Sequence, residues 1–228
     1  MTDRTENTDP YTLSDSAAAA MLRAVPFRRL AVIGDSTAAG TGDPWPGYET
    51  VSWADRLGRW LHAAHPDAAH LNTGVVGAVI ADVRAGQLAA LEEFEPDLVV
   101  VTCGGNDLFL RDASPLTVEG DLDDLCASVA ATGARLALFT LADAYVGRLA
   151  PLRPRFAEFA RSVRRIAHRR DAILTEFWDH PARLREDWLS ADRIHLTMAG
   201  HAVVAAELAK SLARHHAREV PPELIGRS

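Results

Sequence analysis

Three short polar segments of the chain contain the side-chain types that nucleophilic catalysis needs. Ser36 follows an apolar run, Asn106 follows two glycines, and His195 lies three residues after Asp192. A serine at a tight turn between strand and helix exposes its hydroxyl, and a nearby histidine can take the hydroxyl proton. A carboxylate can orient that histidine, and an asparagine amide can donate to an oxyanion. Together these residue types predict the chemistry of a serine hydrolase.

Each segment also has a purely structural interpretation. Ser36 can cap the helix that follows it, and Asn106 is well suited to a turn beside its glycines. Asp192 can be a surface residue and His195 a cap at a helix start. Residues 34–40 can also bind a phosphate, although the lysine of a P-loop is missing. The nucleophilic interpretation is favoured because the three segments occur together.

All three segments follow predicted strands. Apolar, β-branched runs predict strands over the ranges 30–33, 69–73, 98–102, 135–141 and 172–175. Apolar residues at helical spacing predict helices over 15–24, 52–65, 79–94, 117–132 (capped by Thr117), 155–170 and 198–215. This alternation predicts an α/β fold with three layers and a central five-stranded parallel sheet. Ligands of such sheets bind at the carboxyl ends of the strands, where the three segments lie.

The chain is expected to form one catalytic domain over residues 27–214. An N-terminal tail with a short helix precedes it, over 1–26, and a C-terminal tail follows, over 215–228. No internal repeat or convincing interdomain linker divides the sequence. At this length a single core can bury enough apolar surface to fold.

Four segments resemble sequence blocks of the SGNH hydrolases, also called GDSL esterases/lipases. Gly34-Asp35-Ser36 resembles block I, Asn72–Gly77 block II, Gly105-Asn106-Asp107 block III, and Asp192–His195 block V. The blocks occur in the order of the family, and the resemblance covers residues 28 to about 212. One departure is Thr37, where the family often has leucine.

The resemblance implies hydrolysis of a carboxylic ester in a flavodoxin-like SGNH fold, without metal or cofactor. It makes Ser36 the nucleophile, His195 the general base and then acid, and Asp192 the residue that orients the imidazole. Acyl transfer by the same three residues remains an alternative, as does a phosphate-binding module of the flavodoxin type. No long apolar lid is apparent, which favours short acyl esters or acetylated sugars as small-molecule substrates.

The resemblance also implies an oxyanion hole. Its donors would be the backbone N–H groups of Ser36 and Gly77 and the side-chain amide of Asn106. Gly74 is an alternative to Gly77, because either glycine can form the turn. The side chain of Asn106 is expected to face the open site. Asp35 and Asp107 flank these positions and are expected to brace their loops.

The composition is typical of a soluble globular protein. Hydrophobic residues make up 48% of the 228 residues and charged residues 24%, with a net charge of −7. The negative charge argues against nucleic acid or an anionic membrane as the main partner. The two cysteines, Cys103 and Cys126, predict no disulfide scaffold. Residues 1–10 lack the apolar run of a secretory signal, so we expect a cytoplasmic protein.

Other side chains carry weaker signals. The arginines at and just before the predicted helix 155–170 are interpreted as a solvated face rather than a polyanion site. His215-His216 lacks a further ligand at metal-binding spacing, and His201 is expected to be packed rather than catalytic. Aromatic residues in the loops at the expected active edge either line a pocket or cover the sheet: Trp45, Tyr48, Tyr145, Trp178 and Trp188.

Overall fold

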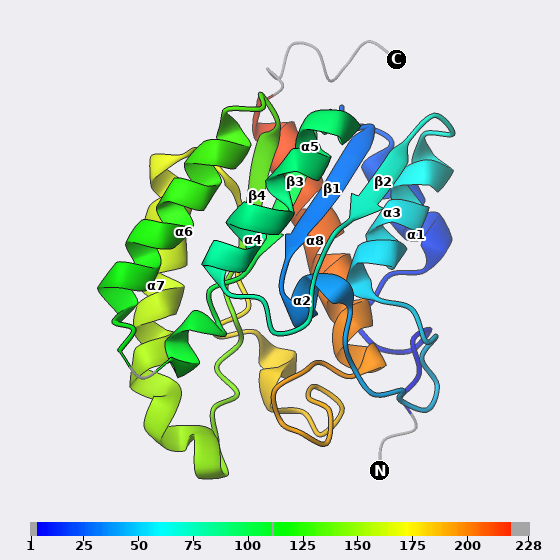
Figure 1. The fold of residues 1–228 in the computed structure, drawn as a ribbon. Helices are drawn as coiled ribbons and strands as arrows, with labels where there is room; N and C mark the ends of the chain where they lie inside the picture. The colour runs from blue at the N-terminus through cyan, green and yellow to red at the C-terminus, as the bar shows by residue number, and fades with distance from the viewer. Residues whose placement is uncertain (1–3, 111, 220–228) are drawn as a thin grey trace.

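A computed structural model of the protein describes residues 4–110 and 112–219, and its centre is a parallel β-sheet (Figure 1). The five strands lie in the order β2-β1-β3-β4-β5, and every neighbouring pair is parallel. This confirms the predicted fold class. The strands are Arg29–Gly34 (β1), Ala69–Asn72 (β2), Leu98–Thr102 (β3), Arg135–Phe139 (β4) and Ile173–Thr175 (β5).

Two layers of helices cover the sheet, because both faces of the strands are apolar. Alternate residues of β1 point to opposite sides, with Leu30 and Val32 in one core and Ala31 and Ile33 in the other. The first core is closed by Asp15–Leu22 (α1), Trp53–Ala64 (α3) and Met198–Glu219 (α8). The second is closed by Ile80–Gly86 (α4), Leu88–Phe94 (α5), Pro115–Ala130 (α6) and Arg153–Arg169 (α7).

Two predicted helices differ in detail from those observed. The predicted helix over 79–94 is divided at Gln87, which separates α4 from α5. Thr117 is not the cap of α6, so that prediction was wrong. The cap is Ser114, whose hydroxyl accepts from the Thr117 N–H at 3.1 Å. Pro115 explains the earlier start, because proline suits the first position of a helix.

The described part of the N-terminal segment packs on the domain. Arg56, which is fully buried in α3, forms an ion pair with Glu6. Asp9 is also buried and binds Arg185 at 2.6 Å. Helix α1 lies against α3 and α8 through its buried residues Ala18 and Leu22. These contacts tie residues 4–26 to the same body as the sheet.

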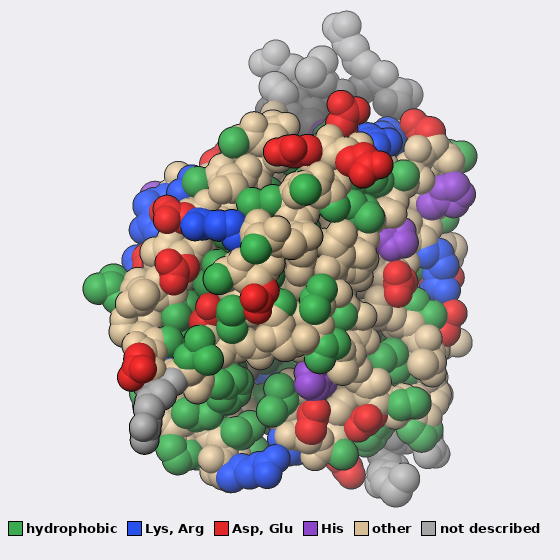
Figure 2. All heavy atoms as spheres, viewed as in Figure 1, with side chains coloured by type: hydrophobic (Ala, Val, Ile, Leu, Met, Phe, Trp, Pro, Cys, Tyr) green, Lys and Arg blue, Asp and Glu red, His purple; other side chains and the backbone are tan. Residues whose placement is uncertain are grey.

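Charges of both signs are interspersed over the face of the molecule seen in Figure 2. Most arginines of α7 pair with carboxylates; Arg165, for example, contacts Glu119 and Glu158. This pairing supports the solvated-face interpretation of the helix. Within residues 4–110 and 112–219, no helix combines the length and apolar character needed to cross a membrane. Cys103 and Cys126 are buried free thiols.

Candidate active site

Ser36 lies at a sharp turn behind the first strand. It is the first residue of the short helix α2, Ser36–Ala39, which Asp35 caps by accepting from the Thr37 N–H at 2.8 Å. Gly34 has a φ of +144°, and a Cβ there would lie 2.0 Å from the carbonyl oxygen of Thr102. Only glycine fits this close approach of two strands. The turn therefore places Ser36 at the carboxyl edge of the sheet.

Two side chains to which the sequence analysis gave no role hold this turn in place. The amide of Gln87 accepts from the Gly34 N–H at 2.8 Å and donates to the Gly34 carbonyl at 2.9 Å. The amide of Asn72 donates to the Ala38 carbonyl at 2.7 Å and accepts from the Gly74 N–H at 2.9 Å. Asn72 could have been singled out because it ends a strand. Gln87 has no such signal, since it lies in a helical pattern far from Gly34 in sequence.

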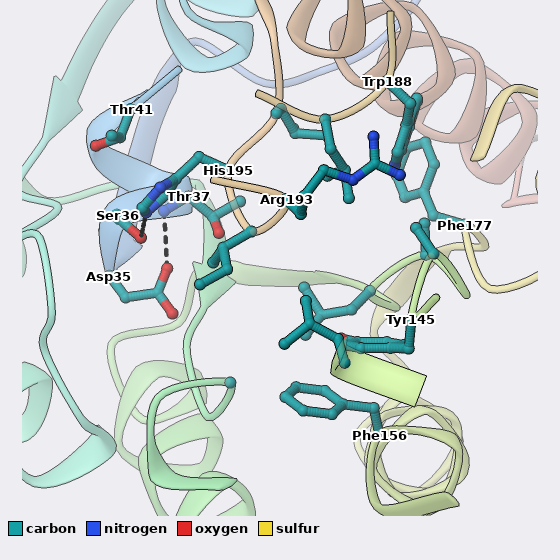
Figure 3. Close-up of a pocket in the computed structure, with 18 of the residues that line it drawn as sticks. Asp35, Ser36, Thr37, Thr41, Tyr145, Phe156, Phe177, Trp188, Arg193 and His195 are labelled. Carbon is teal, nitrogen blue, oxygen red and sulfur yellow. Dashed lines mark hydrogen bonds between the residues drawn. The ribbon is translucent and has the colours of Figure 1, made fainter. Parts of the chain in front are cut away.

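The structure brings Ser36, His195 and Asp192 into one chain of hydrogen bonds. Figure 3 shows the first two of these side chains next to each other. His195 Nε2 lies 2.9 Å from Ser36 Oγ, and His195 Nδ1 lies 2.6 Å from Asp192 Oδ2. The other carboxylate oxygen of Asp192 accepts from the N–H groups of Ile194, at 2.8 Å, and His195, at 3.0 Å. Burial opposes ionisation of Asp192, but these hydrogen bonds outweigh it and lower its pKa. The carboxylate thus stays ionised beside the imidazole.

The predicted oxyanion donors do not all lie at the cavity. Asn106 lines the same cavity as Ser36 and His195, and its Nδ2 also donates to the Ala78 carbonyl at 2.9 Å. An amide has two N–H groups, so one remains available. Gly77 has a φ of +82°, and its N–H has no hydrogen-bond partner among the described residues. Gly77 is not part of the lining of the cavity.

A cavity open to solvent adjoins Ser36 and His195 and encloses, with its mouth, about 930 Å³. Its inner wall is apolar and aromatic, formed among others by Phe139, Tyr145, Phe156, Phe177 and Trp188. Figure 3 shows the rings of Tyr145, Phe156, Phe177 and Trp188 on the side of the cavity away from Ser36. In Figure 2, hydrophobic side chains gather around a hollow in the lower part of the molecule. The exposed apolar residues that line this cavity are Phe109 and Ile194.

The aromatic residues of the loops have different roles. Tyr145 and Trp188 line the cavity. Tyr48 instead donates its hydroxyl to Asp9 at 2.8 Å. Trp45 packs beside Tyr48, and the ring of Trp178 lies beneath the guanidinium of Arg153. Of these five aromatic residues, two line the cavity and three pack elsewhere, so neither interpretation of the sequence holds for all of them.

His201 is packed in the interior, as expected. Its Nδ1 accepts from the Trp53 N–H at 3.3 Å, so its Nε2 carries the proton and donates to the Thr41 carbonyl at 3.2 Å. Burial lowers its pKa to about 4, which keeps the ring neutral. His215 contacts Glu219. In the described part of the chain, no group of three or more His, Cys, Asp and Glu side chains is arranged to hold a metal ion.

Asp35 is a buried carboxyl next to the serine. Burial raises its pKa, hydrogen bonds from the N–H and hydroxyl of Thr37 lower it, and the nearby charge of Asp107 raises it further. The result is a pKa of about 6. Asp107 itself accepts from the Ile80 N–H with both oxygens, and burial raises its pKa as well. The two carboxyls therefore brace the turn before α2 and the start of α4.

Replacing Asp35 with asparagine is expected to stabilise the protein above neutral pH. Because the pKa of Asp35 rises from 3.8 to about 6 on folding, the wild type loses stability as the pH increases through this range. Asparagine keeps the oxygen that caps α2 but carries no charge. The free energy of unfolding should increase by about 1–3 kcal/mol at about pH 8 and much less at about pH 4.

Urea unfolding of both proteins at the two pH values measures this difference. Asp67→Asn serves as the control, because the Asp67 side chain is 77% exposed. A gain for Asp35→Asn that is equal at both pH values would contradict the role of the buried charge.

Comparisons with known proteins agree with this geometry. The sequence profile of the GDSL-like Lipase/Acylhydrolase family matches residues 32–203. Among solved structures, an α/β hydrolase named LAE5, from the metagenome of Lake Arreo in Spain, is 26% identical, with a TM-score of 0.68 over 84% of this chain and 97% of its own. TesA is also 26% identical, with a TM-score of 0.66 over 82% of this chain and 99% of its own.

A third similar structure shares the fold at lower identity. It is Axe2, an acetylxylan esterase from Geobacillus stearothermophilus, with 20% identity and a TM-score of 0.66 over 81% of this chain and 94% of its own. A comparison with curated proteins found no match. The family profile spans most of the chain and includes the segments around Ser36, Asn106 and His195. The chain therefore belongs to the GDSL-like lipase/acylhydrolase family and is an esterase of the SGNH hydrolase type.

Proposed function

We propose that the protein hydrolyses a carboxylic ester through an acyl-enzyme on Ser36. Ser36 Oγ attacks the ester carbonyl while His195 Nε2 accepts the hydroxyl proton. The tetrahedral intermediate collapses, and His195 returns the proton to the alcohol that leaves. Water then attacks the acyl-serine, His195 takes a proton from it, and collapse releases the acid and restores the serine. Asp192 remains ionised throughout and stabilises the imidazolium.

The hydrogen-bonded chain from Ser36 to Asp192 is the observation that supports this proposal most strongly. Its two links are 2.9 and 2.6 Å long. With Nδ1 donating to the carboxylate, the lone pair of Nε2 faces the serine hydroxyl, as a general base requires. His195 is 24% exposed, so water can reach the position from which it attacks the acyl group.

For the oxyanion we propose three donors: the N–H of Ser36, the N–H of Gly77 and the side chain of Asn106. The N–H of Gly74 already donates to Asn72, whereas that of Gly77 is free among the described residues. This contrast favours Gly77 over Gly74. Preorganised donors matter because the negative charge develops only in the tetrahedral intermediate.

Replacing Asn106 with alanine is expected to lower kcat by about 10²–10³-fold with little change in KM, because the amide acts on the oxyanion rather than on the bound ester. The variant should also lose about 1 kcal/mol of stability, since the Ala78 carbonyl loses its donor. Melting temperature and kcat are measured on the same preparation. A destabilised variant with near-normal kcat per folded molecule would remove Asn106 from the catalytic residues.

We further propose short acyl esters as substrates, with the acyl chain in the apolar cavity. The acyl part stays bound to Ser36 after the alcohol leaves, so it benefits most from an enclosed site. Each methylene buried there is worth about 0.8 kcal/mol, or roughly fourfold in kcat/KM. A panel of 4-nitrophenyl esters from acetate to octanoate should therefore show kcat/KM increasing over the first members. A maximum at acetate followed by a steady decrease would show that the cavity does not hold the acyl chain.

A further inference from the structure

Arg193 occupies a backbone position that suits glycine better than arginine. Its φ is +65°, in the left-handed region, which costs a residue with a side chain on the order of 1 kcal/mol. The turn that imposes this conformation is the one that presents His195. In this turn, the N–H of Arg193 donates to the Ser190 carbonyl at 2.9 Å. The N–H groups of the two residues that follow donate to the Asp192 carboxylate. The conformation of the turn therefore does not account for the arginine side chain.

The side chain of Arg193 lies along the wall of the cavity. Figure 3 shows it extending from the loop of His195 toward Trp188, away from Ser36. Among the described residues its guanidinium has no carboxylate partner. By contrast, Arg153 at the same edge forms an ion pair with Asp143 at 2.5 Å. The solvent-exposed guanidinium thus has donors available beside the apolar, aromatic part of the cavity wall.

The nearest carboxylate along the chain is not available to Arg193. Asp192 uses one oxygen for two backbone N–H groups and the other for His195 Nδ1. A second arginine, Arg148, approaches the same loop and donates to the Asp192 carbonyl at 3.5 Å. Both cations therefore raise the positive potential at this side of the cavity, which favours a bound anion.

We propose that Arg193 is a specificity-determining residue that binds an anionic group on the acyl part of the substrate. The substrate class is then an ester whose acyl chain has an apolar body and carries a carboxylate, as in a half-ester of a dicarboxylic acid. The apolar wall receives the chain, and the guanidinium donates to the carboxylate. This inference rests on the proposed function, because it assumes that the acyl chain attached to Ser36 occupies the cavity.

The test compares two matched sets of esters. One set is the mono-4-nitrophenyl esters of hexanedioic, octanedioic and decanedioic acids. The other is the same compounds with the free carboxylate converted to a methyl ester, which removes the charge and adds one methyl group. Only the release of 4-nitrophenol is measured, so cleavage of the methyl ester is not counted. The measured quantity is the ratio of kcat/KM for the charged ester to kcat/KM for its neutral counterpart. Wild-type protein should favour the charged ester for at least one chain length.

In Arg193→Gly and Arg193→Gln this ratio should decrease by about tenfold or more, mainly through KM for the charged ester. Arg193→Lys should retain part of the preference, because it keeps the charge but not the planar fork. A purely structural role would lower kcat/KM for both esters alike and leave the ratio unchanged. Arg23→Gln is the control, since it removes one positive charge at an exposed site on the end of α1.

Two outcomes separate the inference from the function on which it rests. If hydrolysis depends on Ser36 but the ratio is the same in wild type, Arg193→Gly and Arg193→Gln, the role of Arg193 is rejected and the proposed mechanism stands. If Ser36→Ala hydrolyses both sets of esters at the wild-type rate, the mechanism itself is rejected. An equal decrease of the ratio in Arg23→Gln would assign the preference to net charge and overturn the role of Arg193.

Discussion

Replacing Ser36 with alanine is expected to abolish labelling by a fluorophosphonate probe and to lower kcat for ester hydrolysis by about 10³-fold or more. The reason is that the variant lacks the only atom of the proposed mechanism that forms a covalent bond with the substrate. Folding should be preserved, because the hydroxyl makes one hydrogen bond, to His195. Labelling is followed by mass spectrometry of the modified peptide, and hydrolysis by release of 4-nitrophenol.

Ser128→Ala is the matched control for this experiment. Among the described residues, the Ser128 hydroxyl bonds only to the Asp124 carbonyl of its own helix, so both labelling and hydrolysis should remain at the wild-type level. Efficient ester cleavage by a well-folded Ser36→Ala protein, or labelling at another serine, would rule out Ser36 as the nucleophile.

Asp192→Asn is expected to lower kcat by about 10³–10⁴-fold while leaving the fold intact. The two backbone N–H groups that bind Asp192 Oδ1 will hold the oxygen of the asparagine amide, so its NH₂ group faces His195 Nδ1. Nδ1 must then accept that hydrogen bond, and the proton of the neutral ring moves to Nε2. A ring in this tautomer cannot accept the proton of Ser36.

Asp192→Ala separates the two tasks of this carboxylate. It removes the oxygen that holds the turn as well as the charge, so we expect a loss of thermal stability that Asp192→Asn does not show. Asp179→Asn, at an exposed site outside the cavity, should change neither property. Near-normal kcat in Asp192→Asn would mean that His195 is oriented by another group.

The order of strands and helices could be predicted because it depends on the local spacing of apolar residues. The run Leu98–Val101 is apolar at each position, and in the structure it forms most of the central strand, which is buried on both faces. Helix boundaries were less predictable, as Thr117 shows, because capping depends on which hydroxyl lies one residue before the first helical turn. The break at Gln87 could not be predicted. It coincides with a pair of hydrogen bonds from the Gln87 side chain to Gly34, more than fifty residues away in sequence.

The sequence by itself determined the fold class, the family and the residue types of the candidate site. It could do so because tight turns and strand ends demand particular residues, such as Gly34 behind Ser36. Only the tertiary structure decided which of these groups are already hydrogen-bonded to a neighbour and which are not. It showed that the Gly74 N–H is bound by Asn72, that Asn106 is held by Ala78, and that Arg193 lines the cavity without a carboxylate partner in the described part of the chain. Such pairings depend on distances across separate loops, and those distances are set by the packing of the sheet and its helices rather than by spacing along the chain.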